Sequence, residues 1–162
     1  TLSLHDALPI LKAEVLDAVP GGPELRAWFD GHVPSFHDAE VLSITLDRAE
    51  PSCLLRVHAF QMTSEVNSDG FYLLKSHAIV TFQIGAITAM ELDGFNHQNA
   101  LMGLSITSGQ TEVFGGDVVE VFRLELDPAY GVAGFVEGQS LSIGFEAGIP
   151  VGSQYEKRAG LT

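Results

Sequence analysis

The chain has 162 residues, of which 46% are hydrophobic and 18% are charged, a composition typical of one globular domain with its own core. The formal net charge of −13, from 21 acidic and 8 basic residues, argues against nucleic acids and anionic membranes as partners, because proteins bind both through lysine and arginine. It favours a cationic partner, and because Cys53 is the only cysteine the chain can form neither an internal disulfide nor a thiolate metal cluster.

Residues 1–10 match, codon by codon, the peptide that a sequencing adapter encodes. We interpret them as an artefact that is not native; the native start, with any signal segment in it, is then missing. A single β-rich domain is expected over 11–147, and an irregular C-terminal tail over 148–162, where all periodicity is lost. No apolar run reaches the roughly 18 residues that span a bilayer, and the expected location is the cytoplasm.

Two short helices are predicted near the start of the domain. Apolar residues recur at helical spacing over 11–19 and again over 24–29. The break between them, 20–23, consists of prolines and glycines. From residue 40 the apolar period changes to two, which predicts a half-buried strand over 40–47.

Strands joined by short turns account for the rest of the domain. Asn67-Ser68-Asp69-Gly70 is a strong hairpin signal, Gly85-Ala86 is interpreted as a tight turn, and Gly138-Gln139 as the turn of a last hairpin. The strands predicted around these turns cover 53–60, 71–84, 87–92, 104–106, 118–126, 130–137 and 140–146. About seven or eight consecutive strands without long helices favour an antiparallel meander. The predicted fold is therefore mainly β, with α+β as the alternative.

Two polar segments lie among the apolar strands, at 34–41 and 94–101. Each places a histidine and carboxylate or amide groups next to a phenylalanine, Phe36 or Phe95. We expect these phenylalanines to anchor their segments in the core. The segments are the densest clusters of chemically active side chains in the chain, so they are the first candidates for a site.

A metal site could be formed from the imidazoles and carboxylates of these segments, namely His37, Asp38, Glu40 and His97. In an extended segment, however, His37 points to the face opposite Asp38. The favoured interpretation is structural: Asp38 accepts backbone N–H groups at the turn into the strand, and His37 packs beside Trp28. No metal and no cofactor are therefore predicted.

Two further features leave alternatives open. The loop Asn96-His97-Gln98-Asn99 either contacts another protein or a polar ligand, or ties itself to its own sheet edge. His58 and His77 flank the turn at 67–70 and could be cross-strand neighbours that titrate or bind metal together, although two unrelated histidines are the favoured interpretation. The sequence has no nucleophile elbow, phosphate-binding loop or dinucleotide fingerprint, so no catalytic residue is assigned and the chain is predicted not to be an enzyme.

Several of these residues together resemble the bacterial immunity protein 50 family. The segments that carry the resemblance are Trp28, 34–42, 57–66, 70–72, 77–82, 94–99 and Tyr130-Gly131. They cover roughly residues 24–147, and 36–41 with 95–99 are the more specific part. The resemblance implies an immunity protein of a polymorphic toxin system, which binds a cognate protein toxin stoichiometrically and protects the producing cell and its kin without catalysis.

An acidic, β-rich domain without a catalytic motif suits an inhibitor that acts by binding. Candidate contact residues are Asp38, Glu40, Glu65, Asp69, Asp93, Asn96, His97, Gln98 and Asn99. If the toxin is a basic nuclease, exposed carboxylates, including Glu112 and Asp117, would mimic phosphate and speed docking. The alternatives are a β domain that holds a small ligand or metal, and a hydrolase that uses the polar segments as acid and base. The oligomeric state stays open.

Overall fold

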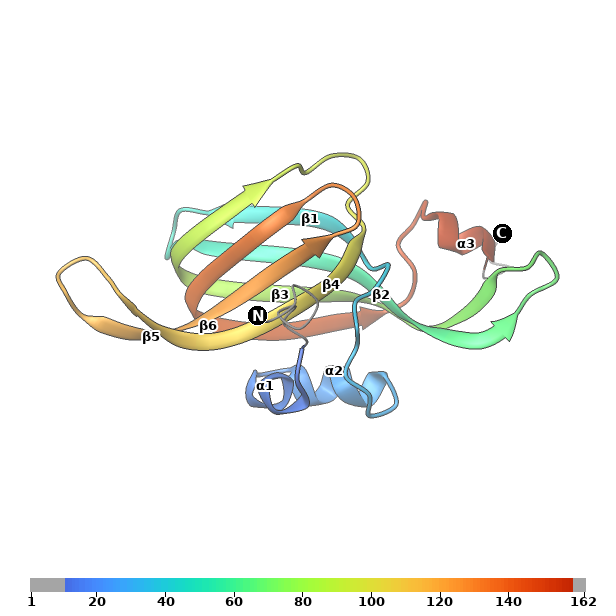
Figure 1. Cartoon of the computed structure of the whole chain (residues 1–162), viewed down its shortest axis with the longest axis horizontal. Coiled ribbons are helices and arrows are strands. Elements are labelled where there is room, and N and C mark those ends of the chain that lie inside the picture. The colour runs from blue at the N-terminus through green and yellow to red at the C-terminus, as the bar shows by residue number, and fades with distance from the viewer. Residues whose placement is uncertain (1–10, 159–162) are drawn as a thin grey trace, which may run out of the picture.

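The computed structural model describes residues 11–158, so the interpretation of residues 1–10 as an artefact lies outside the described residues. Within this range the chain is mainly β, as predicted, with six antiparallel strands and three short helices (Figure 1). The elements are α1 (Ala13–Ala18), α2 (Gly22–Trp28), β1 (Glu40–Asp47), β2 (Ser52–Val66), β3 (Tyr72–Asp93), β4 (Leu101–Glu112), β5 (Val118–Pro128), β6 (Ala133–Ala147) and α3 (Gln154–Arg158).

The described residues form six strands rather than the seven or eight expected, because two expected turns are bends inside long strands. β3 continues through Gly85-Ala86, where Ala86 takes a left-handed φ of 50° and the register shifts just beyond it. β6 likewise continues through Gly138-Gln139. The two bends are partners in the sheet, since Gly85 pairs with Ser140 and Ile87 with Gly138. Glycine and a bulge therefore let both strands bend together without breaking their pairing.

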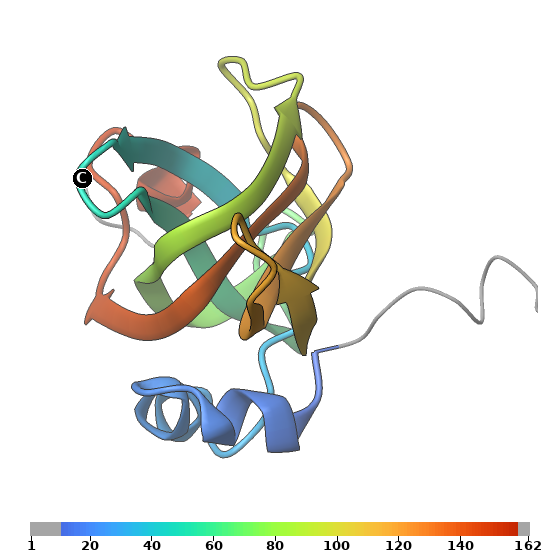
Figure 2. The same cartoon turned by 90° about the vertical axis from the view of Figure 1, so that its left-hand side faces the viewer.

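The sheet has the strand order β1-β2-β3-β6-β5-β4 and curls until its two edge strands meet (Figure 2). Glu40, at the start of β1, forms a bridge with Ala100, just before β4. Two main-chain hydrogen bonds flank it, from Val41 N to Asn99 O at 2.9 Å and from Leu101 N to Ala39 O at 2.8 Å. These contacts close the sheet at one corner, which we call the closure.

The hydrophobic core fills the inside of the curled sheet. Alternate side chains of β2 and β3 point inward, and Val57, Val80 and Phe82 are fully buried. The ring of Phe36 lies 5.7 Å from that of Phe82, so Phe36 anchors its segment as predicted. The same expectation was wrong for Phe95, which is 54% exposed.

Helices α1 and α2 lie side by side beneath the curled sheet (Figures 1 and 2). They bury Leu16 and Leu25 completely. Beyond its pairing with β5, β6 presents a free edge, and there Ile143 N donates to Pro20 O at 2.8 Å. Gly21, at a φ of 86°, approaches the Ile143 carbonyl so closely that any added Cβ would collide with it. The proline- and glycine-rich break predicted between the helices is therefore the segment that attaches them to the edge of β6.

Two hairpins project from opposite ends of the sheet (Figure 1). The β2–β3 arm, residues 61–75, extends past the last pairing partners that β1 and β6 supply to its strands. Its turn is the predicted one: Asn67 Oδ1 accepts from the backbone N of Asp69 at 2.9 Å and of Phe71 at 3.0 Å. The β4–β5 arm, residues 108–121, lies beyond the pairing of β5 with β6.

Helix α3 lies within the segment expected to be irregular from residue 148 onward. Its first turn is capped locally, since Ser153 Oγ accepts from Tyr155 N at 3.2 Å and Glu156 Oε2 accepts from Gly152 N at 3.0 Å. The Tyr155 side chain, only 8% exposed, holds the helix against the sheet. A helix of this length carries no periodic signal, which explains why the sequence pattern missed it. Among residues 11–158, none of the helices has the length and apolar character needed to cross a membrane.

Candidate functional site

The two polar segments predicted as candidate sites lie side by side, because they form the closure. Asp38 N donates to Leu101 O at 2.9 Å, next to the bridge between Glu40 and Ala100. The contacts between the segments are thus made largely by main-chain atoms. Both segments therefore have a structural role, which the sequence had favoured for the first and left open for the second, but main-chain atoms rather than side chains make these contacts.

The amide-rich loop before β4 is tied to its own fold through Asn99. Asn99 is 3% exposed; its Oδ1 accepts from Asn96 N at 3.0 Å and from Val132 N at 3.1 Å. Its Nδ2 donates to Asn96 O at 2.7 Å. Asn96 in turn fixes the loop, with its Oδ1 accepting from Gln98 N at 3.0 Å. Of the two alternatives left open, self-attachment therefore holds for Asn99, whereas His97 and Gln98 are exposed.

His37 and Asp38 contact each other instead of the groups that the structural interpretation of the sequence expected. Asp38 Oδ2 lies 3.1 Å from His37 Nδ1, and both side chains are about half exposed. Trp28 does not pair with His37: its ring lies 5.8 Å from that of Phe145, and its Nε1 donates to Ser76 O at 2.9 Å. No three histidine, cysteine or carboxylate side chains within residues 11–158 are grouped so as to hold a metal ion.

The candidate carboxylates are spread over four places rather than one surface. Asp38 and Glu40 lie at the closure, and Asp93 ends β3, where its Oδ1 accepts from Gly94 N at 2.8 Å. The remaining candidates lie on the arms: Glu65 and Asp69 on the β2–β3 arm, Glu112 and Asp117 on the β4–β5 arm. A single partner surface could therefore include only some of them.

His58 and His77 are cross-strand neighbours, so the interpretation as unrelated histidines was wrong. His58 Nε2 and His77 Nδ1 are 3.0 Å apart, within hydrogen-bond distance. The two rings are stacked, with centroids 5.2 Å apart. Phe60 and Tyr155 complete the cluster, at 5.5 Å and 5.3 Å from the His58 ring. We call these four rings the aromatic cluster.

Burial keeps both histidines of the aromatic cluster neutral at pH 7. His58 is 1% exposed, and burial, with a contribution from His77, lowers its pKa to about 4. Burial also lowers the pKa of His77. In the neutral pair, one ring nitrogen donates and the other accepts. A proton added to His58 would place a charge where water hardly reaches, because its side chain is almost fully buried.

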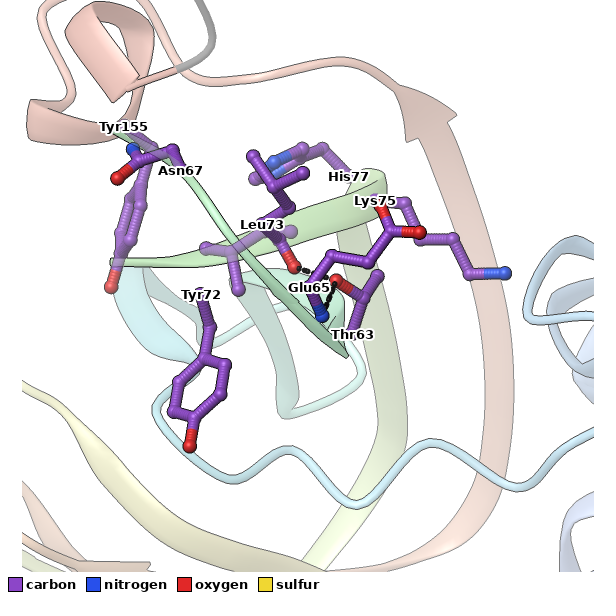
Figure 3. Close-up of a pocket in the computed structure, with 9 residues that line it drawn as sticks. Thr63, Glu65, Asn67, Tyr72, Leu73, Lys75, His77 and Tyr155 are labelled. Carbon is purple, nitrogen blue, oxygen red and sulfur yellow. Dashed lines mark hydrogen bonds between the residues drawn. The ribbon is translucent and has the colours of Figure 1, made fainter. Parts of the chain in front are cut away.

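A pocket of about 430 Å³ lies beside the aromatic cluster, between the β2–β3 arm and α3 (Figure 3). We call it the arm pocket. Its lining residues are Thr63, Glu65, Asn67, Tyr72, Leu73, Leu74, Lys75, His77 and Tyr155. Glu65 is the only one of them that the sequence singled out as a contact residue. Tyr155 and Tyr72 were missed because they are separated by more than eighty positions in the sequence and only the tertiary fold brings them together.

Comparison of the chain with protein-family models, with curated proteins and with solved structures found no match. The resemblance to the immunity protein family therefore stays a prediction. The geometry of the arms, the arm pocket and the closure carries the functional argument.

Proposed function

We propose that this protein is a bacterial immunity protein that binds a cognate protein toxin and neutralises it stoichiometrically in the cytoplasm. The observation that carries the proposal is the exposed apolar face of the β2–β3 arm. Met62, Val66 and Tyr72 on it are 52%, 53% and 56% exposed. Exposed apolar groups gathered in one place and bordered by polar groups are typical of protein interaction sites.

The pairing of the strands places these side chains together. Met62 pairs with Leu74, and Val66 pairs with Tyr72, so the members of each pair lie on the same face of the hairpin. Methionine and tyrosine are enriched at protein interfaces. The arm projects from the body of the molecule (Figure 1), so a partner could reach this face without any change in the sheet.

Charge supports a basic partner. The whole chain has a net charge of −13, and two of its carboxylates, Glu65 and Asp69, lie near the tip of the β2–β3 arm. Its one cation, Lys75, is already paired with Asp30, with Nζ 2.8 Å from Oδ2. A basic toxin would be steered toward this surface, and the resemblance to immunity proteins points to the same kind of partner.

A second candidate function is the binding of a small ligand, favoured by the volume and mixed lining of the arm pocket. In that case the exposed face of the arm would have no partner of its own. The two functions differ in what they predict for residues outside the pocket. Val66 lies on the exposed face but does not line the pocket, so a change there affects only the binding of a protein.

The test begins with long-read sequencing of the source locus to identify a toxin gene beside this one. The toxic domain is then expressed in cells with the wild-type chain, with Val66→Lys or with Val118→Lys, the same change at an exposed valine on the β4–β5 arm. We expect the wild type and Val118→Lys to restore growth and to form a complex of defined stoichiometry with the toxin, and Val66→Lys to do neither. A neighbourhood without a toxin gene, or growth unaffected by Val66→Lys, would count against the proposal.

A further inference from the structure

We propose that the arm pocket receives a basic side chain, arginine or lysine, from the protein that docks on the β2–β3 arm. The site consists of Glu65, His77 and Tyr155, with Tyr72 at the outer edge of the pocket, where its ring points away from the Glu65 carboxylate (Figure 3). This inference rests on the proposed function and adds to it the chemistry of the contact. It identifies one anchoring interaction within a larger interface.

The Glu65 carboxylate supplies a negative charge that the fold leaves uncompensated. Among the described residues, no ion pair or side-chain hydrogen bond engages this carboxylate; only the backbone N of Glu65 is bound, to Thr63 Oγ1 at 3.3 Å. Lys75 lines the same pocket, but its ammonium group is held by Asp30. The pocket therefore has an available anionic group and no available cation, which favours a positively charged guest.

Three of the lining residues, Tyr72, His77 and Tyr155, are aromatic. The face of an aromatic ring carries partial negative charge and attracts ammonium or guanidinium groups, most strongly where water is excluded. The imidazole of His77 does not oppose this attraction, because burial lowers its pKa and leaves it uncharged at pH 7. The aromatic rings and the Glu65 carboxylate therefore both attract a cation.

The position of Tyr72 links the pocket to the docking face. Tyr72 lines the arm pocket and also lies on the exposed apolar face, opposite Val66. A partner seated on that face would have its own surface at the mouth of the pocket. One long basic side chain could then enter, with its alkyl stem against the rings and its charged end near Glu65. Arginine in a pocket with aromatic walls is a common energetic centre of protein interfaces.

The test uses the full chain and two small probes, acetyl-arginine amide and its uncharged isostere acetyl-citrulline amide, at constant ionic strength. Binding is followed by the NMR signals of the His77 and Tyr155 rings. We expect saturable shifts with acetyl-arginine amide, with a Kd on the order of 1–10 mM, and at least fivefold weaker binding of the citrulline probe. Equal binding of the two probes, or no saturable shift with arginine, overturns the inference.

A matched pair of variants locates the binding. Glu65→Gln removes the carboxylate of the pocket, and Glu112→Gln removes a carboxylate at the same kind of position on the β4–β5 arm. We expect Glu65→Gln to weaken arginine binding at least fivefold and Glu112→Gln to leave it unchanged. An equal effect of both changes would mean that net charge alone attracts the probe, and the inference would be wrong.

The two proposals can fail separately. If the arginine probe binds through Glu65 but the chain neutralises no toxin, the pocket assignment stands and the proposed function fails. If the chain neutralises the toxin and Glu65→Gln leaves both toxin affinity and probe binding unchanged, the function stands and the pocket assignment fails.

Discussion

Asn99 and His97 lie two positions apart in one loop, yet their surroundings are opposite. Asn99 is buried and uses both ends of its amide to hold the loop to itself and to Val132. His97 is exposed. The sequence grouped both as contact residues because amides and imidazoles serve equally well in structure and in recognition.

This contrast leads to a prediction on stability. Asn99→Ala leaves the buried Val132 N and the part-buried Asn96 N and O without their partners, so we expect it to lower the free energy of unfolding by about 2–4 kcal/mol. His97→Ala removes no buried contact and should change it by less than about 0.5 kcal/mol. Urea unfolding followed by circular dichroism measures both. Similar losses for the two variants would show that the loop is not held through Asn99.

His58 makes the stability of the fold depend on pH. Its pKa is about 4 in the folded protein and takes its ordinary value, 6.5, when the chain unfolds. Between these values the unfolded chain binds the additional proton, so stability is complete above about pH 6.5 and falls as pH drops toward 4. The loss attributable to His58 is on the order of 3 kcal/mol.

The measurement compares the wild type with His58→Phe in urea at several pH values from 7 to 4. Carboxylates also titrate at the acid end of this range, but they are common to both proteins. We expect the wild type to lose more stability than the variant as the pH falls. Parallel curves for the two proteins would show that His58 does not carry this dependence.

At the scale of elements, Tyr155 is the buried residue among the described side chains of α3, and it holds the helix to the sheet. Tyr155 packs its ring against His58, Phe60 and His77. We expect Tyr155→Ala to lower the free energy of unfolding by about 3 kcal/mol and to raise the pKa of His58 toward 6.5, because the imidazole is then opened to water. Titration of the His58 ring by NMR gives this pKa.

Gln154→Ala, at the exposed neighbouring position, is the control for Tyr155→Ala. It should leave both the stability and the pKa of His58 unchanged. If the pKa of His58 does not rise in Tyr155→Ala, the burial of the pair arises from the sheet alone and α3 has no part in it.

The connection between β5 and β6 depends on a glycine that the loop of Asn99 approaches closely. Gly131 and Gly152 share a φ of 81°, but a Cβ at Gly131 would collide with Gln98 O and Asn99 Oδ1, whereas one at Gly152 meets nothing within 4 Å. We expect Gly131→Ala to lower the free energy of unfolding by about 2–4 kcal/mol. Gly152→Ala should lower it by about 1 kcal/mol, because only backbone strain contributes there. Thermal unfolding of the two variants compares them directly, and equal losses would contradict the close contact.

At the scale of the whole molecule, the net charge of −13 should govern how fast the partner arrives. We expect the association rate constant with the toxin to fall roughly tenfold or more between low and physiological salt, because screening removes long-range attraction. Stopped-flow mixing at several salt concentrations measures it. The reversal Glu65→Lys on the β2–β3 arm should slow association more than Glu24→Lys on α2. A rate that is insensitive to salt and to both reversals would rule out electrostatic steering.

The local parts of the fold could be read from the sequence because their causes are local. The positions of strands β1 and β5 and the turn at Asn67-Ser68-Asp69-Gly70 depend on patterns among neighbouring residues, and all three were predicted. The bend at Gly85-Ala86 was mistaken for a turn because a glycine ends a strand only where no partner strand bends with it. Here β6 bends with β3. The two bends are far apart in sequence, so no local pattern could indicate that they pair.

By itself, the sequence determined that the protein is acidic, mainly β and assembled from short helices followed by consecutive strands. Only the tertiary structure decided that the edge strands meet at the closure, that His58 and His77 share a hydrogen bond, and that Glu65, Tyr72 and Tyr155 surround one pocket. The physical reason is that burial pattern and turn chemistry act along the chain. Strand register and the packing of α3 arise from contacts between residues far apart in sequence, and these decide which side chains form a site.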